Sequence, residues 1–543
     1  MRRCGRGPTS GVCFGTNDSA AVSNPRVLRM QAAATRCTQC LDGQALIPNI
    51  AHQVSGNLAK VEMSAIESAI PTFDGLYIGG GWTPPQGGDS IDHISPISES
   101  LLGTAPAASP ADIDAAVAAA RRAFDEGPWP GMPVEERIAT LGRVKEIYAA
   151  RSKDIAQLIT AEMGCPSSIA DLLQVGYPQY ILDYYLDLAR SWEFEQLRGS
   201  TIVRHAPVGV VAAIVPWNTP HSAFMVKLAP ALLSGCTVVA KPSPETALDG
   251  LVLAEIFAEA GFPEGVVNVV PAGRESGEHL VSHPGVDKVT FTGSTAAGKR
   301  IAAICGGAIR RCSLELGGKS AAIILDDADI PSVVQGLRFA SFLNSGQVCT
   351  NQTRILAPES SYPAVVEALC EMVSTMQVGD PRDPTTEVGP LVSHRQRERV
   401  ERYISIGRDE GATIACGGGR PASQRMGWFV EPTVFSDVDN SMTIAQEEIF
   451  GPVVALISYE DEDHAVELAN DSSYGLGGGI WTADADRGVN LARRIRTGQM
   501  SINGAEPALV APFGGFKESG IGRESGPEGL MNYLELQTIS CSG

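Results

Sequence analysis

Residues 208–306 alternate between short apolar strands and helices, and this alternation constrains the fold more than any other feature of the chain. The predicted order is strand 208–215, helix 222–234, strand 237–240, helix 246–260, strands 266–270 and 288–291, and helix 294–304. Gly235 and Gly261 follow the first two helices, where a glycine commonly ends a helix. Strands and helices repeated at this spacing predict a parallel sheet with crossover helices, the α/β class.

A second α/β pattern is predicted over residues 318–532, with a strand at 321–325, a helix at 331–343 and a strand at 353–356. In open parallel sheets, ligands bind beyond the carboxyl ends of the strands. Polar segments follow three strands of the first pattern directly: Pro216-Trp217-Asn218, Lys241 and Gly293-Ser294. We therefore expect a ligand site at the carboxyl edge of the first sheet.

Composition excludes several classes of protein. The 543 residues are 44% hydrophobic, enough for large cores, and 62 acidic against 42 basic side chains give a formal charge of -20. Nonspecific nucleic-acid binding depends on cations, so no nucleic-acid partner is predicted. The apolar stretch 208–226 is broken by Pro216, Asn218 and Pro220, so no membrane span is predicted. Twelve scattered cysteines predict a reducing compartment, here the cytoplasm.

The first 62 residues differ from the rest, with six Arg before Cys37 against one acid. They contain no apolar signal-peptide core, and residues 1–70 are predicted to be a disordered extension outside the catalytic fold. A transit peptide is the alternative, and it would place the protein in an organellar matrix. Cys37 and Cys40 form one CxxC pair without a second, which is an incomplete metal site, so no metal is predicted.

Four further features each have a chemical and a structural interpretation. Cys349 in a loop is a candidate nucleophile or a buried structural cysteine. Glu315, between two leucines, is a candidate general base or a strand-edge residue that faces solvent. The segment 293–299 resembles a phosphate-binding P-loop, but Arg300 stands where a hydroxyl is needed. His279 and His283 have metal-ligand spacing but are interpreted as surface residues.

Seven motifs in one order resemble those of the aldehyde dehydrogenase superfamily, whose members are NAD(P)-dependent and hydrolytic. The resemblance extends from about residue 75 to the end of the chain. Each motif alone is weak, but seven in the family's order are specific. They are Pro216-Trp217-Asn218, Lys241-Pro242-Ser243, Phe291-Thr292-Gly293-Ser294, Leu314-Glu315-Leu316-Gly317-Gly318-Lys319, Gly346-Gln347-Val348-Cys349, Glu447-Glu448-Ile449-Phe450-Gly451-Pro452 and Pro512-Phe513-Gly514-Gly515.

The resemblance implies oxidation of an aldehyde to a carboxylic acid through a covalent intermediate. Cys349 matches the nucleophile, which would form a thiohemiacetal and, after hydride transfer, a thioester. Asn218 and the backbone N–H of Cys349 match the oxyanion donors. Glu315 matches the base that activates water to hydrolyse the thioester. Lys227 matches a proton-relay lysine, and Glu524 matches an acid of the water channel.

The cofactor residues are also implied by the resemblance. Lys241 and Glu448 match the residues that hold the two riboses, and Gly293, Ser294 and Gly298 match the pyrophosphate region. The other matches to the cofactor site are Val215, Trp217, Ser243, Glu245, Leu316 and Phe450.

Two departures from the family pattern bear on specificity. Many NAD-preferring members carry Glu at the position of Pro244, and here Glu245 stands beside it. We favour NAD, with NADP as the alternative. In the substrate pocket, Thr219 replaces a common aromatic residue and precedes Pro220 and His221, while Phe513 provides an aromatic wall. This mixed polar pocket does not identify the aldehyde.

The family fold implies a Rossmann-like cofactor domain over 71–184 and 208–317 and an α/β catalytic domain over 318–532. A small β element from 185–207 and 533–543 would join subunits of a homodimer or homotetramer. The alternative functions are a CoA-acylating semialdehyde dehydrogenase, a P-loop nucleotide-binding protein, and a catalytically idle binding protein. Glu315 disfavours the first, Arg300 the second, and the intact set of Cys349, Glu315 and Asn218 the third.

Overall fold

The structure is a computed structural model that describes residues 70–506, 508 and 510–541. The predicted extension over 1–70, with Cys37 and Cys40, lies outside the described residues except for Ile70. All described residues belong to one compact unit, Glu67–Gly543. In the part of the chain that the structure describes, no helix is both long and apolar enough to cross a membrane.

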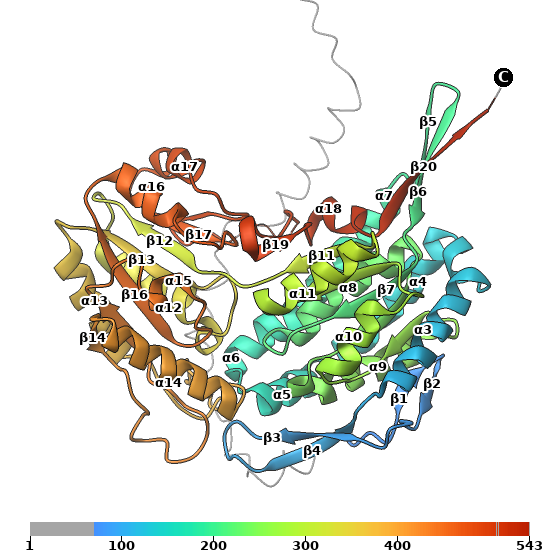
Figure 1. Cartoon of the computed structure of the whole chain (residues 1–543), viewed down its shortest axis with the longest axis horizontal. Coiled ribbons are helices and arrows are strands. Elements are labelled where there is room, and N and C mark those ends of the chain that lie inside the picture. The colour runs from blue at the N-terminus through green and yellow to red at the C-terminus, as the bar shows by residue number, and fades with distance from the viewer. Residues whose placement is uncertain (1–69, 507, 509, 542–543) are drawn as a thin grey trace, which may run out of the picture. The chain divides into compact units, whose positions relative to one another are not determined.

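The first sheet has eight strands, and its five central strands are parallel (Figure 1). Four of these five are the strands expected from the sequence, and the fifth, β11, was not predicted. Antiparallel strands flank this centre on both sides. In spatial order the strands are β19 (Gly520–Ile521), β11 (Arg311–Glu315), β10 (Lys288–Thr292), β7 (Val210–Ile214), β8 (Thr237–Lys241), β9 (Val267–Val269), β1 (Leu76–Ile78) and β2 (Gly81–Thr83).

Helices cover both faces of this sheet, and each face has its own apolar core. One face packs against α3 (Pro110–Asp125), α10 (Arg274–Ser282) and α11 (Thr295–Gly307). The other packs against α4 (Val134–Ala150), α5 (Ser152–Met163), α7 (Tyr177–Ser191), α8 (Pro220–Ser234) and α9 (Ala247–Ala260). The predicted glycine ends are confirmed, since Gly235 and Gly261 adopt left-handed conformations after α8 and α9.

The second sheet has seven strands, parallel except for β14 at one edge. The order is β14 (Thr413–Cys416), β15 (Thr433–Ser436), β16 (Val453–Tyr459), β13 (Gln352–Pro358), β12 (Ser320–Ile324), β17 (Gly478–Trp481) and β18 (Ser501–Ile502). One face packs against α12 (Ile330–Phe342) and α13 (Tyr362–Ser374). The other packs against α14 (His394–Asp409), α15 (Thr443–Gln446), α16 (Glu462–Asn470) and α17 (Ala485–Ala492).

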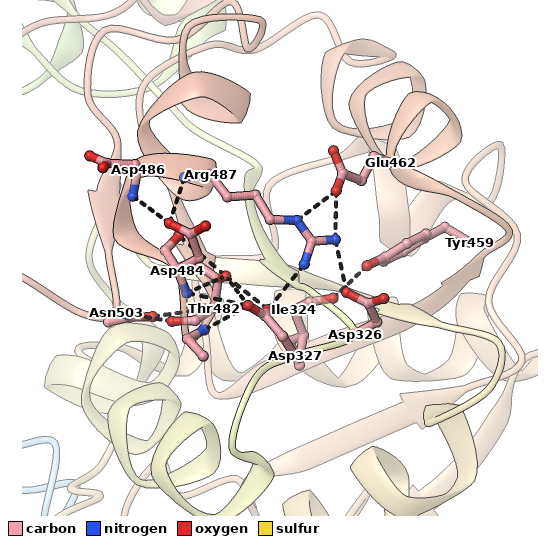
Figure 2. Close-up of polar contacts among 11 residues, drawn as sticks. Ile324, Asp326, Asp327, Tyr459, Glu462, Thr482, Asp484, Asp486, Arg487 and Asn503 are labelled. Atoms are coloured by element: carbon pink, nitrogen blue, oxygen red, sulfur yellow. Dashed lines mark hydrogen bonds and ion pairs between the residues drawn. The ribbon is translucent and has the colours of Figure 1, made fainter.

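An ion network closes the carboxyl edge of the second sheet around Arg487 of α17 (Figure 2). The Arg487 guanidinium contacts Asp326 at 2.8 Å, Asp327 at 3.4 Å and Glu462 at 2.6 Å. Thr482, just after β17, donates its hydroxyl to Asp327 at 2.8 Å. The network thus joins the ends of β12 and β17 to the first turns of α16 and α17.

A third sheet has the order β20-β6-β5, from β20 (Leu534–Ser540), β6 (Thr201–Pro207) and β5 (Glu195–Arg198). The hairpin predicted over 185–207 therefore begins ten residues later than expected, because α7 continues to Ser191. The expected segment 318–532 also needs correction, because β19 within it pairs with β11 of the first sheet.

Short elements complete the described chain. A separate hairpin pairs β3 (Ser90–Ile94) with β4 (Leu101–Pro106). The remaining turns and short helices are η3 (Trp129–Gly131), α6 (Ser167–Ile169), η4 (Ala170–Gly176), η5 (Pro244–Thr246), η6 (Leu343–Gly346), η7 (Lys517–Ser519) and α18 (Gly526–Met531).

Candidate active site

Cys349 lies in the loop between η6 and β13, at the amino edge of the second sheet, and is partly exposed. Three consecutive residues of the preceding turn have left-handed backbones: Asn344 (φ 53°), Ser345 (φ 58°) and Gly346 (φ 77°). Each left-handed residue other than glycine costs roughly 1–2 kcal/mol, so neighbouring contacts must hold this turn. Gly346 is required here, because a Cβ would collide with the carbonyl of Gly451.

Glu315 is the last residue of β11, at the carboxyl edge of the first sheet. Its side chain is buried, with 3% of the residue exposed, so the solvent-facing interpretation is wrong. Neither carboxylate oxygen has a hydrogen-bond partner among the described residues. Burial, followed by the nearby charge of Glu524, raises the pKa of Glu315 well above its usual range. A carboxyl group with a raised pKa is suited to accept a proton near neutral pH.

The thiol of Cys349 is also electrostatically perturbed. Burial and the negative charges of Glu448 and Glu315 raise the pKa of Cys349 to about 12. The thiol is therefore protonated at neutral pH and needs a proton acceptor or a nearby positive charge to become a nucleophile. Gly318, three residues after Glu315, packs so closely on the Cys349 main-chain oxygen that a Cβ would collide with it, so the segments that carry Cys349 and Glu315 are neighbours.

Lys227 of α8 lies fully buried behind Glu315. Its ammonium group donates to the Thr292 hydroxyl at 2.6 Å and forms an ion pair with Glu524. The backbone of Glu524 pairs with that of Phe513 through two hydrogen bonds of 2.6 and 2.7 Å. Residues predicted separately from distant segments, Lys227, Glu524 and Phe513, therefore meet in one place. Thr292 links the ion pair to the end of β10, one residue before the predicted cofactor segment.

Asn218 is buried between β7 and α8 and contacts the loop that carries Cys349. Its side-chain Nδ2 donates to the main-chain oxygen of Gln347 at 3.0 Å. Its own main-chain oxygen accepts hydrogen bonds from Gln174 Nε2 at 2.8 Å and Asn344 Nδ2 at 3.2 Å. The side-chain amide has a second hydrogen that these contacts leave available. The sequence predicted Asn218 at this site but missed Gln174 and Asn344.

A cleft of about 450 Å³ lies at the carboxyl edge of the first sheet, where a ligand site was expected. Its walls include Ile214, Lys241, Phe291, Ser294 and Ala297. The Ser294 hydroxyl caps α11, so this helix presents its N-terminus to the cleft. Burial lowers the pKa of Lys241 to about 8. A helix N-terminus and a lysine at the ends of parallel strands fit a phosphate-bearing nucleotide.

Other predicted cofactor residues lie near the same edges. The rings of Trp217 and Phe450 pack edge to face, with centroids 5.4 Å apart. Glu448 accepts a hydrogen bond from the Gly318 N–H at 3.0 Å, so it contacts the turn that follows Glu315. Burial raises the pKa of Glu448. Gly298 packs so closely on Leu316 that a Cβ would collide with that side chain. Val215 is buried.

Glu245 has partners that the sequence did not suggest. Ser243 donates its hydroxyl to Glu245 at 2.5 Å, and Arg395 of α14 forms an ion pair with it at 2.9 Å. Glu245 is therefore paired with an exposed residue of α14, a helix that packs on the second sheet.

Three histidines are accounted for by structural contacts. His221 is fully buried, with one ring nitrogen 3.0 Å from the Tyr148 hydroxyl and the other 3.0 Å from the main-chain oxygen of Asp249. Neither ring nitrogen of His221 is therefore available to a substrate, whereas Thr219, a predicted pocket residue, is half-buried. His279 and His283 both contact Asp114, at 2.5 and 3.4 Å.

Comparison with known proteins gives consistent matches. Residues 82–539 match the model of the aldehyde dehydrogenase family. Geranial dehydrogenase from Castellaniella defragrans is 48% identical over 86% of this chain and 98% of its own length. The crystal structure of an aldehyde dehydrogenase from Mycobacterium tuberculosis complexed with NAD+ has a TM-score of 0.85 at 47% identity, covering 87% of this chain and 98% of that one. A mutant aldehyde dehydrogenase from Pseudomonas syringae, complexed with NAD+ and octanal, has a TM-score of 0.84 at 40% identity, covering 86% and 97% of the two chains.

Proposed function

The chain belongs to the aldehyde dehydrogenase family, and on that premise we propose how its own residues carry out the reaction. The enzyme oxidises an aldehyde to a carboxylic acid with NAD as the electron acceptor. The observation that carries our assignment is the neighbourhood of Cys349 and Glu315, a partly exposed thiol beside a buried carboxyl group without a hydrogen-bond partner among the described residues.

We propose that Cys349 forms the covalent bond to the substrate. After losing its proton, the Cys349 sulfur attacks the aldehyde carbonyl carbon, and the carbonyl oxygen becomes an oxyanion. The free hydrogen of Asn218 Nδ2 and the main-chain N–H of Cys349 stabilise that oxyanion. NAD, held in the cofactor cleft, would supply the hydride acceptor, and loss of a hydride from the thiohemiacetal carbon would leave a thioester on Cys349.

Glu315 is proposed to complete the reaction by activating water. The carboxylate takes one proton from a water molecule, whose oxygen attacks the thioester carbon, and the carbon–sulfur bond then breaks. Glu315 then gives this proton to the leaving Cys349 sulfur, so the products are the carboxylic acid and the free Cys349 thiol. Lys227 and Glu524, joined as an ion pair near Glu315, tune the pKa of the base in opposite directions.

The cofactor is proposed to lie in the cleft at the carboxyl edge of the first sheet. Its helix N-terminus, Lys241 and Ser294 support this placement. The other residues proposed to hold it are Val215, Trp217, Ser243, Glu245, Gly293, Gly298, Leu316, Glu448 and Phe450. NADP remains the alternative cofactor, because Pro244 occupies the position of the discriminating carboxylate.

For the substrate, we propose an apolar aldehyde that enters past Thr219 and Phe513. Burial of His221 removes one polar group from the expected pocket. Two similar proteins support this class: one is named for geranial, and the other was crystallised with octanal. An enzyme with higher kcat/KM for a charged aldehyde than for octanal would contradict this proposal.

The assembly and the compartment are also proposals. Strands β20, β6 and β5 form a sheet with exposed apolar residues such as Leu197, Leu536 and Ile539. Because sheet edges and apolar patches favour pairing, we propose a homodimer or homotetramer joined through this element.

We propose a cytoplasmic location, since every described cysteine is free and a catalytic thiol needs a reducing environment. We retain residues 71–184 and 208–317 as the cofactor domain, whose sheet also includes β19, and the rest of 318–532 as the catalytic domain.

The direct test is an NADH-formation screen over a panel of aldehydes, with NAD and NADP supplied separately. We expect NADH and the carboxylic acid in equal amounts, without added CoA. A strict requirement for CoA would instead support the acylating alternative. Absence of NADH with every aldehyde would contradict the proposed activity.

A further inference from the structure

Two buried amides from distant segments converge on a single main-chain oxygen, that of Asn218. Gln174 comes from the short helix η4, and Asn344 comes from η6, the turn before Cys349. Both residues are fully buried, and their side-chain nitrogens donate to the Asn218 oxygen at 2.8 and 3.2 Å.

The oxygen atoms of these two side-chain amides indicate why Gln174 and Asn344 are present. Gln174 Oε1 and Asn344 Oδ1 are both buried without a hydrogen-bond partner among the described residues. Leaving a buried acceptor unpaired is unfavourable, so stability alone does not explain either amide. Rotating either amide by half a turn would place its oxygen against the Asn218 oxygen. Each side chain is therefore retained for its N–H donor.

Both amides are themselves held in unusual backbone conformations. Gln174 lies in a wide π-helical turn, a form that is rare and concentrated at functional sites. The Tyr148 hydroxyl donates to the Gln174 main-chain oxygen at 3.1 Å. Asn344 is left-handed, and the neighbouring Ser345 hydroxyl anchors that turn by donating to the Gly389 oxygen at 3.0 Å.

Hydrogen bonds to both the main chain and the side chain of Asn218 define its orientation. Its main-chain oxygen is held by two donors, and its Nδ2 donates to Gln347, two residues before Cys349. With the backbone and one amide hydrogen fixed, the second amide hydrogen has a defined direction. We propose that Gln174 and Asn344 are positioning residues that clamp Asn218 so that its free hydrogen points to the developing oxyanion. This inference rests on the proposed role of Asn218 as an oxyanion donor.

The test uses the full chain and the rate of the first NADH burst, which reports formation of the thioester. Asn218→Ala should slow the burst by about 10²–10³-fold, as for loss of an oxyanion donor. Gln174→Met should slow it by about tenfold, because a misplaced donor loses part of its effect. NAD binding, followed by fluorescence titration, should be unchanged in both variants.

A double variant distinguishes positioning from general destabilisation. If Gln174 acts through Asn218, then adding Gln174→Met to Asn218→Ala should cause no further loss of burst rate. The matched control is Asn268→Leu, because Asn268 is also fully buried and donates to main-chain oxygens of Val238 and Gly265 at 3.1 and 2.9 Å. The control should lower the melting temperature without slowing the burst.

If Gln174→Met does not fold, a more conservative variant can replace it. Gln174→Glu has the same shape and can donate only when protonated, so its burst rate relative to the wild type should recover as pH falls. A pH-independent ratio, or additive losses in the double variant, would overturn the clamp. A normal burst in Asn218→Ala would instead contradict the proposed role of Asn218 itself.

Discussion

Charged side chains lie at the carboxyl edges of both sheets, but the carboxyl groups at the two edges differ in whether they have a partner. At the edge of the second sheet, Arg487 meets three carboxylates, all of them partly exposed (Figure 2). At the edge of the first sheet, Lys227 pairs with Glu524, while the buried Glu315 has no hydrogen-bond partner among the described residues.

The difference indicates that the Arg487 network has a structural role, whereas the group around Glu315 is suited to proton transfer. The carboxylates paired with Arg487 tie the loops after the strands to the helices. Glu315 instead has a raised pKa, so it can exchange a proton during a reaction. Cys349, the proposed nucleophile, lies at the amino edge of the second sheet. A residue's position at a carboxyl edge therefore does not by itself identify an active site. Whether its charged group has a hydrogen-bond or ion-pair partner must also be known.

Removal of the nucleophile should have the largest effect. Cys349→Ala should abolish NADH formation, because it removes the sulfur proposed to carry the thioester. Cys416→Ala is a control from β14, and this variant should keep its activity. Continuous absorbance assays with enzyme at high concentration make the comparison. Aldehyde-dependent NADH formation by Cys349→Ala would contradict the covalent mechanism.

Changes to the Lys227–Glu524 pair should shift the pH dependence in opposite directions. The Lys227 cation lowers the pKa of Glu315 and the Glu524 charge raises it. Lys227→Met should therefore raise that pKa, so turnover would require a higher pH. Glu524→Gln should lower it and extend turnover to lower pH. Lys227→Met should lose about tenfold or more at neutral pH if proton transfer limits the rate, whereas Glu524→Gln should not show this loss.

The pH–rate profiles of kcat for both variants and the wild type test this prediction. Shifts in the same direction would mean that the pair acts on packing rather than on the charge of Glu315.

Arg487→Gln should have the smallest effect, and on stability rather than on activity. The network is partly exposed, so its loss should cost about 1 kcal/mol of unfolding free energy. The denaturation midpoint should fall, and less so in high salt, because salt already screens the ion pairs. Measured kcat should equal that of the wild type. A large loss of kcat would show that the two carboxyl edges are not functionally distinct.

Local patterns in the sequence predicted much of the first sheet. The strands and helices around 208–306 follow from apolar spacing and glycine ends, and α8 ends at Gly235 as expected. The predicted strand 208–215 is shortened to Val210–Ile214. The hairpin boundary was misplaced, because the amphipathic helix α7 continues to Ser191 and no breaker precedes it.

The candidate site could be predicted only in part. Asn218, Glu315 and Cys349 stand in motifs, and the structure brings them to adjacent edges. Gln174 lies 44 residues from Asn218 in a π-helical turn, and no sequence periodicity indicates that contact. The left-handed turn at Asn344 and Ser345 was also missed, because both residue types are common in other conformations.

We propose that Cys349 and Glu315 divide the reaction between them, and rapid-mixing kinetics of Glu315→Gln is the sharpest test of this division. This variant keeps the size of the side chain but removes the base, so steady-state turnover should fall by about 10²–10⁴-fold. We expect a burst of about one NADH per active site, followed by a stall with an acyl group on Cys349 visible by mass spectrometry. Wild-type steady-state turnover by Glu315→Gln would contradict the account.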